Sequence, residues 1–163
     1  MVSGIFLAVF SFAAFGQEWR KMNDAELRSA VPEKAPVIAE NIETEFRTAS
    51  GITNGRASVF GVVIITAGYE ADGKYTHFLR TGAAIKIGDI ELAAGDYIFG
   101  YRRVDQGSLR MTFYKARSGD LVGETKAILD EKKGGIYSFL IGQPKEKAGK
   151  IFIGRFTLDY KLD

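Results

Sequence analysis

The chain has 163 residues, of which 46% are hydrophobic, and this is enough for one domain with a substantial core. Its 22 basic and 20 acidic residues give a formal net charge of +2, which does not fit a protein that binds nucleic acid by neutralising many phosphates. It has no cysteine, which excludes disulfides, thiol catalysis and thiolate metal sites.

The N-terminus carries an apolar run from Ile5 to Phe15 that is too short to span a bilayer of roughly 30 Å as a helix. Ala14 and Gly16 occupy the small-residue positions before a cleavage site. The pattern predicts a signal peptide over residues 1–16, although no Lys or Arg precedes the apolar run; the alternative is a buried N-terminal helix or strand. We therefore expect an exported protein, periplasmic or extracellular, with no stable membrane anchor after cleavage.

A short helix is expected next. Asn23 followed three residues later by Glu26 is the pattern of a capping box, and Pro32 stops the helix soon afterwards. We expect this helix and an otherwise extended lead-in over residues 17–40, followed by a single β domain over residues 41–163.

The β domain begins with an ambiguous segment. Residues 42–48 alternate between apolar or threonine side chains and charged ones, as on a strand. The spacing of four from Ile38 to Phe46 also fits a helix. The threonines and Phe46 favour a strand, which we expect Gly51 to close.

The following strands are clearer. Residues 58–66 are nearly all apolar and many are β-branched, which predicts a strand buried on both faces in the middle of the fold. Residues 75–80 form the next strand. Two short strands, 84–87 and 90–92, flank Gly88-Asp89, which suits a type II′ turn with Gly88 at positive φ.

Residues 97–103 and 108–115 predict a further hairpin. We expect a three-residue loop, Asp105 to Gly107, with Gly107 in the left-handed region and Val104 opposite Ser108. This register makes one face uniformly apolar, whereas a shift by one residue would mix the faces. The apolar face would consist of Tyr97, Phe99, Tyr101, Met111 and Phe113.

Three more strands complete the chain, at residues 121–129, 136–142 and 151–162, with charged loops over 131–135 and 143–150. The resulting fold class is all-β: an antiparallel β-sandwich of about eight to ten short strands with one short N-terminal helix. The alternative closure is an up-and-down β-barrel.

Three neighbouring elements carry a resemblance: Arg80-Thr81-Gly82-Ala83, the Gly88-Asp89 hairpin and the run from Leu92 to Tyr97. Over about residues 80–114 the sequence resembles an uncharacterised family of exported bacterial domains with an R-T-G-A element, a glycine hairpin and an L-x-A-G-x-Y element. The resemblance implies export and a β-sandwich, and it implies no reaction. In such domains the glycine makes a turn and the tyrosine starts the next strand, often as a tyrosine corner.

The sequence contains no recognisable catalytic motif. His77 is the only histidine, and its alternation with Tyr75 and Leu79 indicates a half-buried or surface position on a strand. Phosphate-binding glycine loops and a nucleophile elbow are absent. We expect no catalytic residue, no metal site and no cofactor. Most carboxylates fall in turns or alternate outward, namely Glu43, Glu45, Asp89, Glu91, Asp96, Asp120 and Glu124.

One constellation follows from the hairpin register, because Arg102 then faces Arg110 on the outward side. Like charges directly opposite each other cost a few tenths to about 1 kcal/mol, so a partner is expected, either Glu124 on the next strand or an external anion. We hypothesise a shallow site for an anionic or sugar-like ligand, with Arg102 and Arg110 as donors and Tyr114 as a platform. The alternative is a solvated arginine pair neutralised within the sheet.

The sequence therefore predicts an exported, non-enzymatic β-sandwich module, either structural or binding a ligand or another exported protein. A second possibility is a β-barrel carrier of a small apolar ligand, with aromatic side chains lining a cavity. A third is a hydrolase, which would need two carboxylates roughly 5 to 10 Å apart in one cleft.

Overall fold

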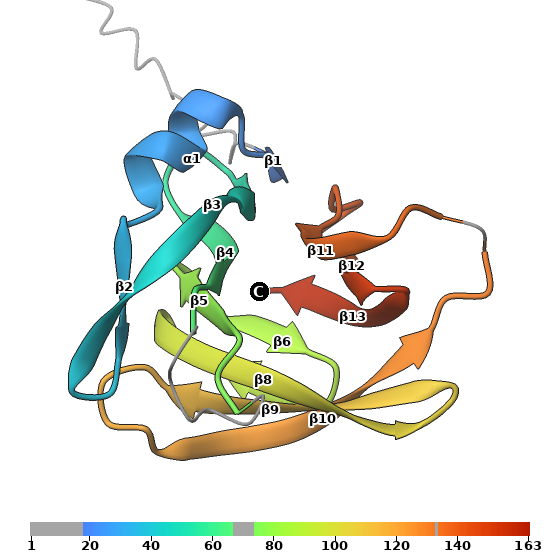
Figure 1. Ribbon diagram of the computed structural model, residues 1–163. Helices are drawn as coiled ribbons and strands as arrows, with labels where there is room; N and C mark the ends of the chain where they lie inside the picture. The colour runs from blue at the N-terminus through green and yellow to red at the C-terminus, as the bar shows by residue number, and fades with distance from the viewer. Residues whose placement is uncertain (1–17, 67–73, 133) are drawn as a thin grey trace, which may run out of the picture.

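The computed structural model of the protein describes residues 18–66, 74–132 and 134–163 (Figure 1), so the signal peptide predicted over 1–16 lies outside the described residues. Within these ranges the chain forms thirteen strands and one helix, and the paired strands are antiparallel, which confirms the all-β prediction. The strand count exceeds the number predicted. The elements are β1 (Arg20–Lys21), α1 (Asp24–Ala30), β2 (Lys34–Val37), β3 (Glu40–Thr53), β4 (Ser58–Ile64), β5 (His77–Thr81), β6 (Ile85–Ile87), β7 (Ile90–Leu92), β8 (Gly95–Asp105), β9 (Ser108–Lys115), β10 (Leu121–Leu129), β11 (Tyr137–Ile141), β12 (Ala148–Gly154) and β13 (Phe156–Leu162).

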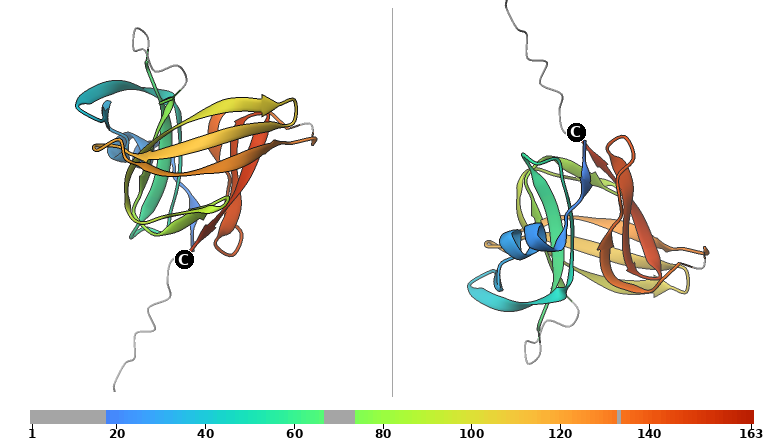
Figure 2. Two further views of the ribbon diagram at one scale, coloured as in Figure 1. Left: turned by 90° about the horizontal axis from the view of Figure 1, so that it is seen from below. Right: turned by 90° about the horizontal axis from the view of Figure 1, so that it is seen from above.

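The strands belong to one continuous sheet in the order β1-β3-β4-β5-β8-β9-β10-β13-β12-β11, with β2 paired to β3 and the β6–β7 hairpin paired to β13. After β10 the chain crosses over and returns through β11 and β12, so that β13 lies beside β10 and β11 is at the far end. The sheet curls until β11 lies against β3 and β4 (Figures 1 and 2). The fold is therefore one continuous sheet that curls until it is nearly closed.

The concave face of the sheet encloses the main core, in which aromatic rings from distant strands meet. Phe99 and Phe113 stack with ring centroids 4.8 Å apart, and Phe139 of β11 lies 6.1 Å from Phe99. Phe139 covers Gly61 of β4, where an added Cβ would lie 2.6 Å from the phenyl ring. Glycine at this position therefore allows β11 to cross closely over β4.

A second apolar cluster lies on the outer face of the sheet. Helix α1, strand β2 and the first half of β3 cover the outer sides of β4, β5 and β8 (Figure 1). Strand β4 contributes Val59 to the inner core and Phe60 and Val62 to the outer cluster. This confirms the prediction that the strand within 58–66 is buried on both faces.

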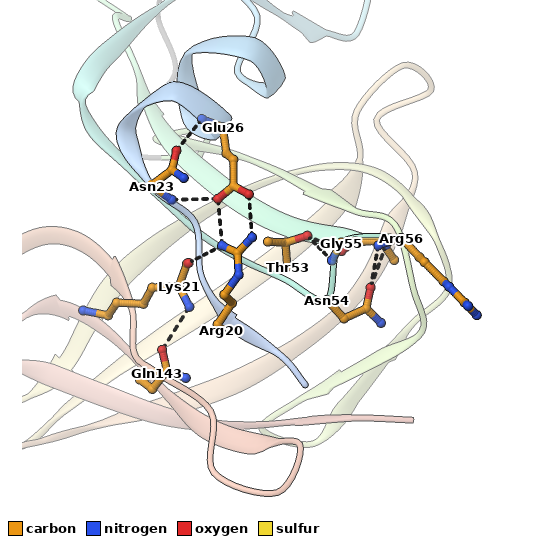
Figure 3. Close-up of polar contacts among 10 residues, drawn as sticks. Arg20, Lys21, Asn23, Glu26, Thr53, Asn54, Gly55, Arg56 and Gln143 are labelled. Atoms are coloured by element: carbon orange, nitrogen blue, oxygen red, sulfur yellow. Dashed lines mark hydrogen bonds and ion pairs between the residues drawn. The ribbon is translucent and has the colours of Figure 1, made fainter. Parts of the chain in front are cut away.

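Side chains bridge the seam between the two ends of the sheet. The backbone N–H of Ile141 in β11 donates to Ser50 Oγ of β3 at 2.9 Å. The amide of Gln143 accepts from the Lys21 backbone N–H at 2.9 Å (Figure 3). It also donates to the Trp19 carbonyl at 3.3 Å. A side-chain amide thus substitutes for part of a backbone ladder between the end of β11 and β1.

The predicted capping box is confirmed at the start of α1. Asn23 Oδ1 accepts from the Glu26 N–H, and Glu26 Oε2 accepts from the Asn23 N–H, both at 2.9 Å (Figure 3). Arg20 donates to both oxygens of the same carboxylate. The hydrogen bonds from Arg20, with that from Asn23, lower the pKa of Glu26 to about 2.

The R-T-G-A and L-x-A-G-x-Y elements meet at a single carbonyl group. The Tyr97 hydroxyl donates to the Ala93 carbonyl at 2.8 Å, and Thr81 Oγ1 donates to the same oxygen at 2.9 Å. Tyr97 is buried at the start of β8, so it has the geometry of a tyrosine corner. Gly88 has a φ of +55°, as its predicted turn requires.

The central register of the β8–β9 hairpin is confirmed, with Phe99 opposite Phe113 and Tyr101 opposite Met111. The expected apolar face is buried except at Tyr101, which is 38% exposed. The face is therefore apolar in composition but is not buried along its whole length.

The loop predicted for this hairpin was wrong. Asp105, and not Val104, is opposite Ser108, and only Gln106 and Gly107 form the turn. Gly107 is not among the glycines with positive φ. The register shifts between Arg103 and Asp105, and this bulge absorbs the extra residue, so both loop lengths leave the centre of the hairpin in the same register.

The single strand predicted over 151–162 was also wrong, because the chain reverses at Gly154, which has a φ of +60°. The two halves are β12 and β13, with Ile153 opposite Phe156. The reversal buries Ile151 and Ile153, which a single strand would have placed on the polar face. Similarly, β3 does not end at Gly51 but continues to Thr53.

Candidate functional site

Two arginines face each other on the outer side of the β8–β9 hairpin. Arg102 is opposite Arg110 in the ladder, and both side chains are exposed. Lys126 of β10 is opposite Arg110, so three cations form a row across three adjacent strands. Because side chains opposite each other in an antiparallel ladder are within about 5.5 Å at Cβ, these charges are close enough to repel each other.

One carboxylate partly offsets this charge. The Nε of Arg110 lies 3.9 Å from Oε2 of Glu124, and Thr112 Oγ1 donates to Oε1 of Glu124 at 3.1 Å. The side chains of Arg110 and Glu124 are about half exposed, so solvent weakens their attraction. Arg102 has no ion pair among the described residues.

A lysine and two tyrosines form one side of the site. The rings of Tyr75 and Tyr114 meet edge to face, with centroids 5.3 Å apart. The Nζ of Lys74 lies 5.3 Å from the Tyr75 ring centroid and 5.4 Å from that of Tyr114. Hydrogen bonding to Tyr75 raises the pKa of Lys74, which adds a further cation to this side of the site.

Lys74, Tyr114, Glu124 and the two arginines line a shallow depression of about 210 Å³, together with Gly100, Tyr101 and Thr112. Its lining includes three cations, Lys74, Arg102 and Arg110, and one carboxylate, Glu124. Gly100 lies in register with Thr112, so no side chain from β8 fills the space between the arginines and Tyr114. The depression is smaller than the pockets that usually hold drug-sized ligands, which suits a small anion or the charged end of a larger molecule.

The structure thus brings together Arg102, Arg110 and Tyr114, the three candidate binding residues, beside Glu124. Sequence reasoning missed Lys74. Its place in the site depends on how the segment before β5 packs against Tyr114 of β9, and no local pattern carries that information.

His77 is more deeply buried than the sequence indicated, with an exposed fraction of 2%. Its ring stacks on Phe99 at 4.7 Å, its Nε2 lies 3.4 Å from the Ser138 carbonyl, and its Nδ1 lies 2.8 Å from Thr76 Oγ1. Because a carbonyl only accepts, Nε2 carries the proton and Nδ1 accepts from Thr76. Burial lowers the pKa of His77 to about 4, so it is neutral and out of reach of a dissolved substrate.

The carboxylates considered for hydrolysis are dispersed over the surface. Asp96 pairs with Arg80 at 2.6 Å and raises the pKa of that guanidinium. Glu45 lies 3.9 Å from Arg47, and Asp120 accepts from Ser118. Among the described residues no three His, Asp or Glu side chains are grouped so that they could hold a metal ion.

The inner core formed by the described residues has no room for a ligand of the size that a carrier would hold. The cavity enclosed by the inner aromatic and aliphatic side chains has a volume of about 10 Å³, which accommodates at most a single water molecule. The filled core therefore gives no support to a carrier of an apolar ligand. Within the described ranges no helix has both the length and the apolar composition that a membrane crossing requires.

Three comparisons with known proteins, against family models, curated proteins and solved structures, found no match to this chain. The resemblance to exported bacterial domains stays a prediction.

Proposed function

We propose that the protein is an exported, non-enzymatic binding module, and that the depression between Lys74, Arg102, Arg110 and Tyr114 binds the anionic group of a small ligand. The ligand class that fits best is a sugar-like carboxylate. The planar guanidinium groups donate to a carboxylate, and the tyrosine and glycine side of the depression accepts the ring that carries it.

The observation that carries the proposal is the direct cross-strand pairing of Arg102 with Arg110. This pair destabilises the unliganded fold, and Glu124 approaches only one of the two guanidinium groups, at 3.9 Å. A bound carboxylate would lie between both groups and remove the repulsion. The charge balance of the lining, three cations to one carboxylate, favours an anion over a neutral sugar.

The test is isothermal titration of the purified protein with D-glucuronate, D-glucose and acetate at low ionic strength. We expect glucuronate to bind, acetate to bind more weakly and glucose not to bind. The substitution of Arg102→Gln together with Arg110→Gln should weaken glucuronate binding by at least about tenfold, which corresponds to about 1.4 kcal/mol.

The matched control exchanges two other opposed cations, Lys86→Gln and Lys161→Gln, and should leave glucuronate binding unchanged. Failure of all three compounds to bind, or equal loss in both double variants, would contradict the proposed site.

A further inference from the structure

A second pair of like charges occurs on a different part of the sheet. Lys86 of β6 is opposite Lys161 of β13, and both side chains are exposed. Glu91 is opposite Lys86 on the other side, yet neither Lys86 nor Lys161 forms an ion pair among the described residues. Glu91 therefore offsets part of the charge of Lys86 across the ladder, but no direct ion pair within the described ranges neutralises either lysine.

The surface around this pair is a wide depression of about 490 Å³. Its lining has four lysines, Lys86, Lys145, Lys150 and Lys161, and a single acid, Asp159, which is already paired with Lys150 at 2.7 Å. Small residues form the floor. Ala148 is opposite Lys161 in the ladder, and Gly88 lies beside Asp159, to whose carbonyl it donates at 2.8 Å.

The turn that presents Lys145 is held in a conformation that its side chains disfavour. Lys145 and Ala148 exchange backbone hydrogen bonds of 2.8 and 3.0 Å around Glu146 and Lys147, whose φ angles are +52° and +81°. Two positive φ angles in a two-residue turn normally select Asn and Gly. The Lys147 carbonyl accepts from the Leu162 N–H at 2.8 Å, which ties the turn to β13 beside Lys161. Strain of this kind persists where the surrounding structure enforces it and is concentrated at functional sites.

We propose that the outer face of β6, β13 and β12 is a second anion-binding surface, for a ligand that carries two or more closely spaced phosphate or sulfate groups. Lysine ammonium groups are compact charges that approach tetrahedral oxyanions from several directions. Lys86 and Lys161 converge on one such group, and Lys145 lies across the small-residue floor to contact the next. This surface is distinct from the arginine depression, and the proposal does not depend on the function assigned to that site.

The experiment is isothermal titration of the purified protein with inorganic triphosphate and, separately, with a fully sulfated heparin disaccharide, at low ionic strength. We expect at least one of these to bind, and the stronger of the two identifies whether the natural ligand bears phosphate or sulfate. Lys86→Gln with Lys161→Gln should weaken that binding by at least about tenfold, whereas Arg47→Gln with Arg56→Gln, two exposed arginines outside both depressions, should change it by less than about twofold.

A matched pair at the floor gives a second test that does not remove a lysine. Ala148→Glu places a carboxylate opposite Lys161 and should abolish binding, whereas Ala148→Gln adds the same bulk without charge and should retain most of it. Absence of binding by both anions would overturn the proposal. Equal loss in the lysine and arginine double variants would overturn it too, because it would show attraction to the net charge alone.

Discussion

The two faces of the β8–β9 hairpin differ in the side chains that they place opposite each other: the inner face pairs aromatic rings, and the outer face pairs two arginines. On the inner face Phe99 stacks on Phe113 with centroids 4.8 Å apart, and both rings are buried. On the outer face, three residues along β8, Arg102 is opposite Arg110. The inner pair contributes to stability in the way expected of a folding core, whereas the outer pair opposes it. Apolar burial thus stabilises the inner face along the hairpin, whereas on the outer face it reaches Ile98 and gives way to the exposed arginine pair.

The largest expected effect is on the inner face. Phe99→Ala removes a buried ring that also stacks on His77, and it should lower the free energy of unfolding by about 3 to 5 kcal/mol. Chemical denaturation measures this loss. The matched control is Arg102→Ala on the outer face of the same strand, which should cause no loss of comparable size. Similar losses for both variants would remove the distinction between the faces.

The second expected effect is a pH dependence of the free energy of unfolding, caused by His77 on the inner face. The pKa of His77 is about 4 in the folded protein, below the ordinary value of 6.5, so the unfolded chain binds the proton more readily. Neutral His77 therefore contributes fully to the free energy of unfolding above about pH 6.5. This contribution is lost as the pH falls towards 4, by roughly 3 kcal/mol in total.

The measurement is the difference in unfolding free energy between the native protein and His77→Gln at pH 7 and pH 4. Because other groups titrate equally in both proteins, the difference isolates His77. A difference that does not change with pH would contradict the burial of an uncharged imidazole.

A smaller effect is expected at the carbonyl where the two sequence elements meet. Tyr97→Phe removes the hydroxyl that donates to Ala93 but leaves the ring in the core and leaves Thr81 bonded to the same oxygen. The loss should be about 1 kcal/mol, measured by thermal or chemical unfolding. A loss as large as that for Phe99→Ala would mean that the hydroxyl organises more of the sheet than its hydrogen bonds to Ala93 and from Lys115 account for.

The smallest expected effect is a gain in stability instead of a loss. Arg102→Gln removes one of two opposed charges and should raise the free energy of unfolding by a few tenths to about 1 kcal/mol, while weakening the binding of glucuronate. The control is Arg110→Gln, which also breaks the contact with Glu124 and should gain less stability. A variant that loses both stability and binding would show that the pair is structural.

The features that the sequence predicted correctly depend on neighbouring residues. The capping box at Asn23 and Glu26 is a local motif, and the Arg102–Arg110 pair follows from alternation within one hairpin. The break at Gly154 was not predictable, because the apolar residues on both sides of a tight reversal resemble one alternating run.

The remaining features depend on how distant strands meet. His77 is buried because Phe139 of β11 closes over it, and Lys74 joins the arginine site because its segment packs on Tyr114. The seam at which Ser50 meets Ile141 depends on the curvature of the whole sheet. None of these contacts leaves a periodic signal in the sequence.

The most direct test of anion binding at Arg102 and Arg110 is a nuclear magnetic resonance titration of the native protein with D-glucuronate. We expect saturable shifts of the Arg102 and Arg110 side-chain Nε–H signals and of the Gly100 amide, with Lys86 and Lys161 unaffected. No shifts at the arginines, or shifts of the same size at both cationic surfaces, would contradict binding at this site.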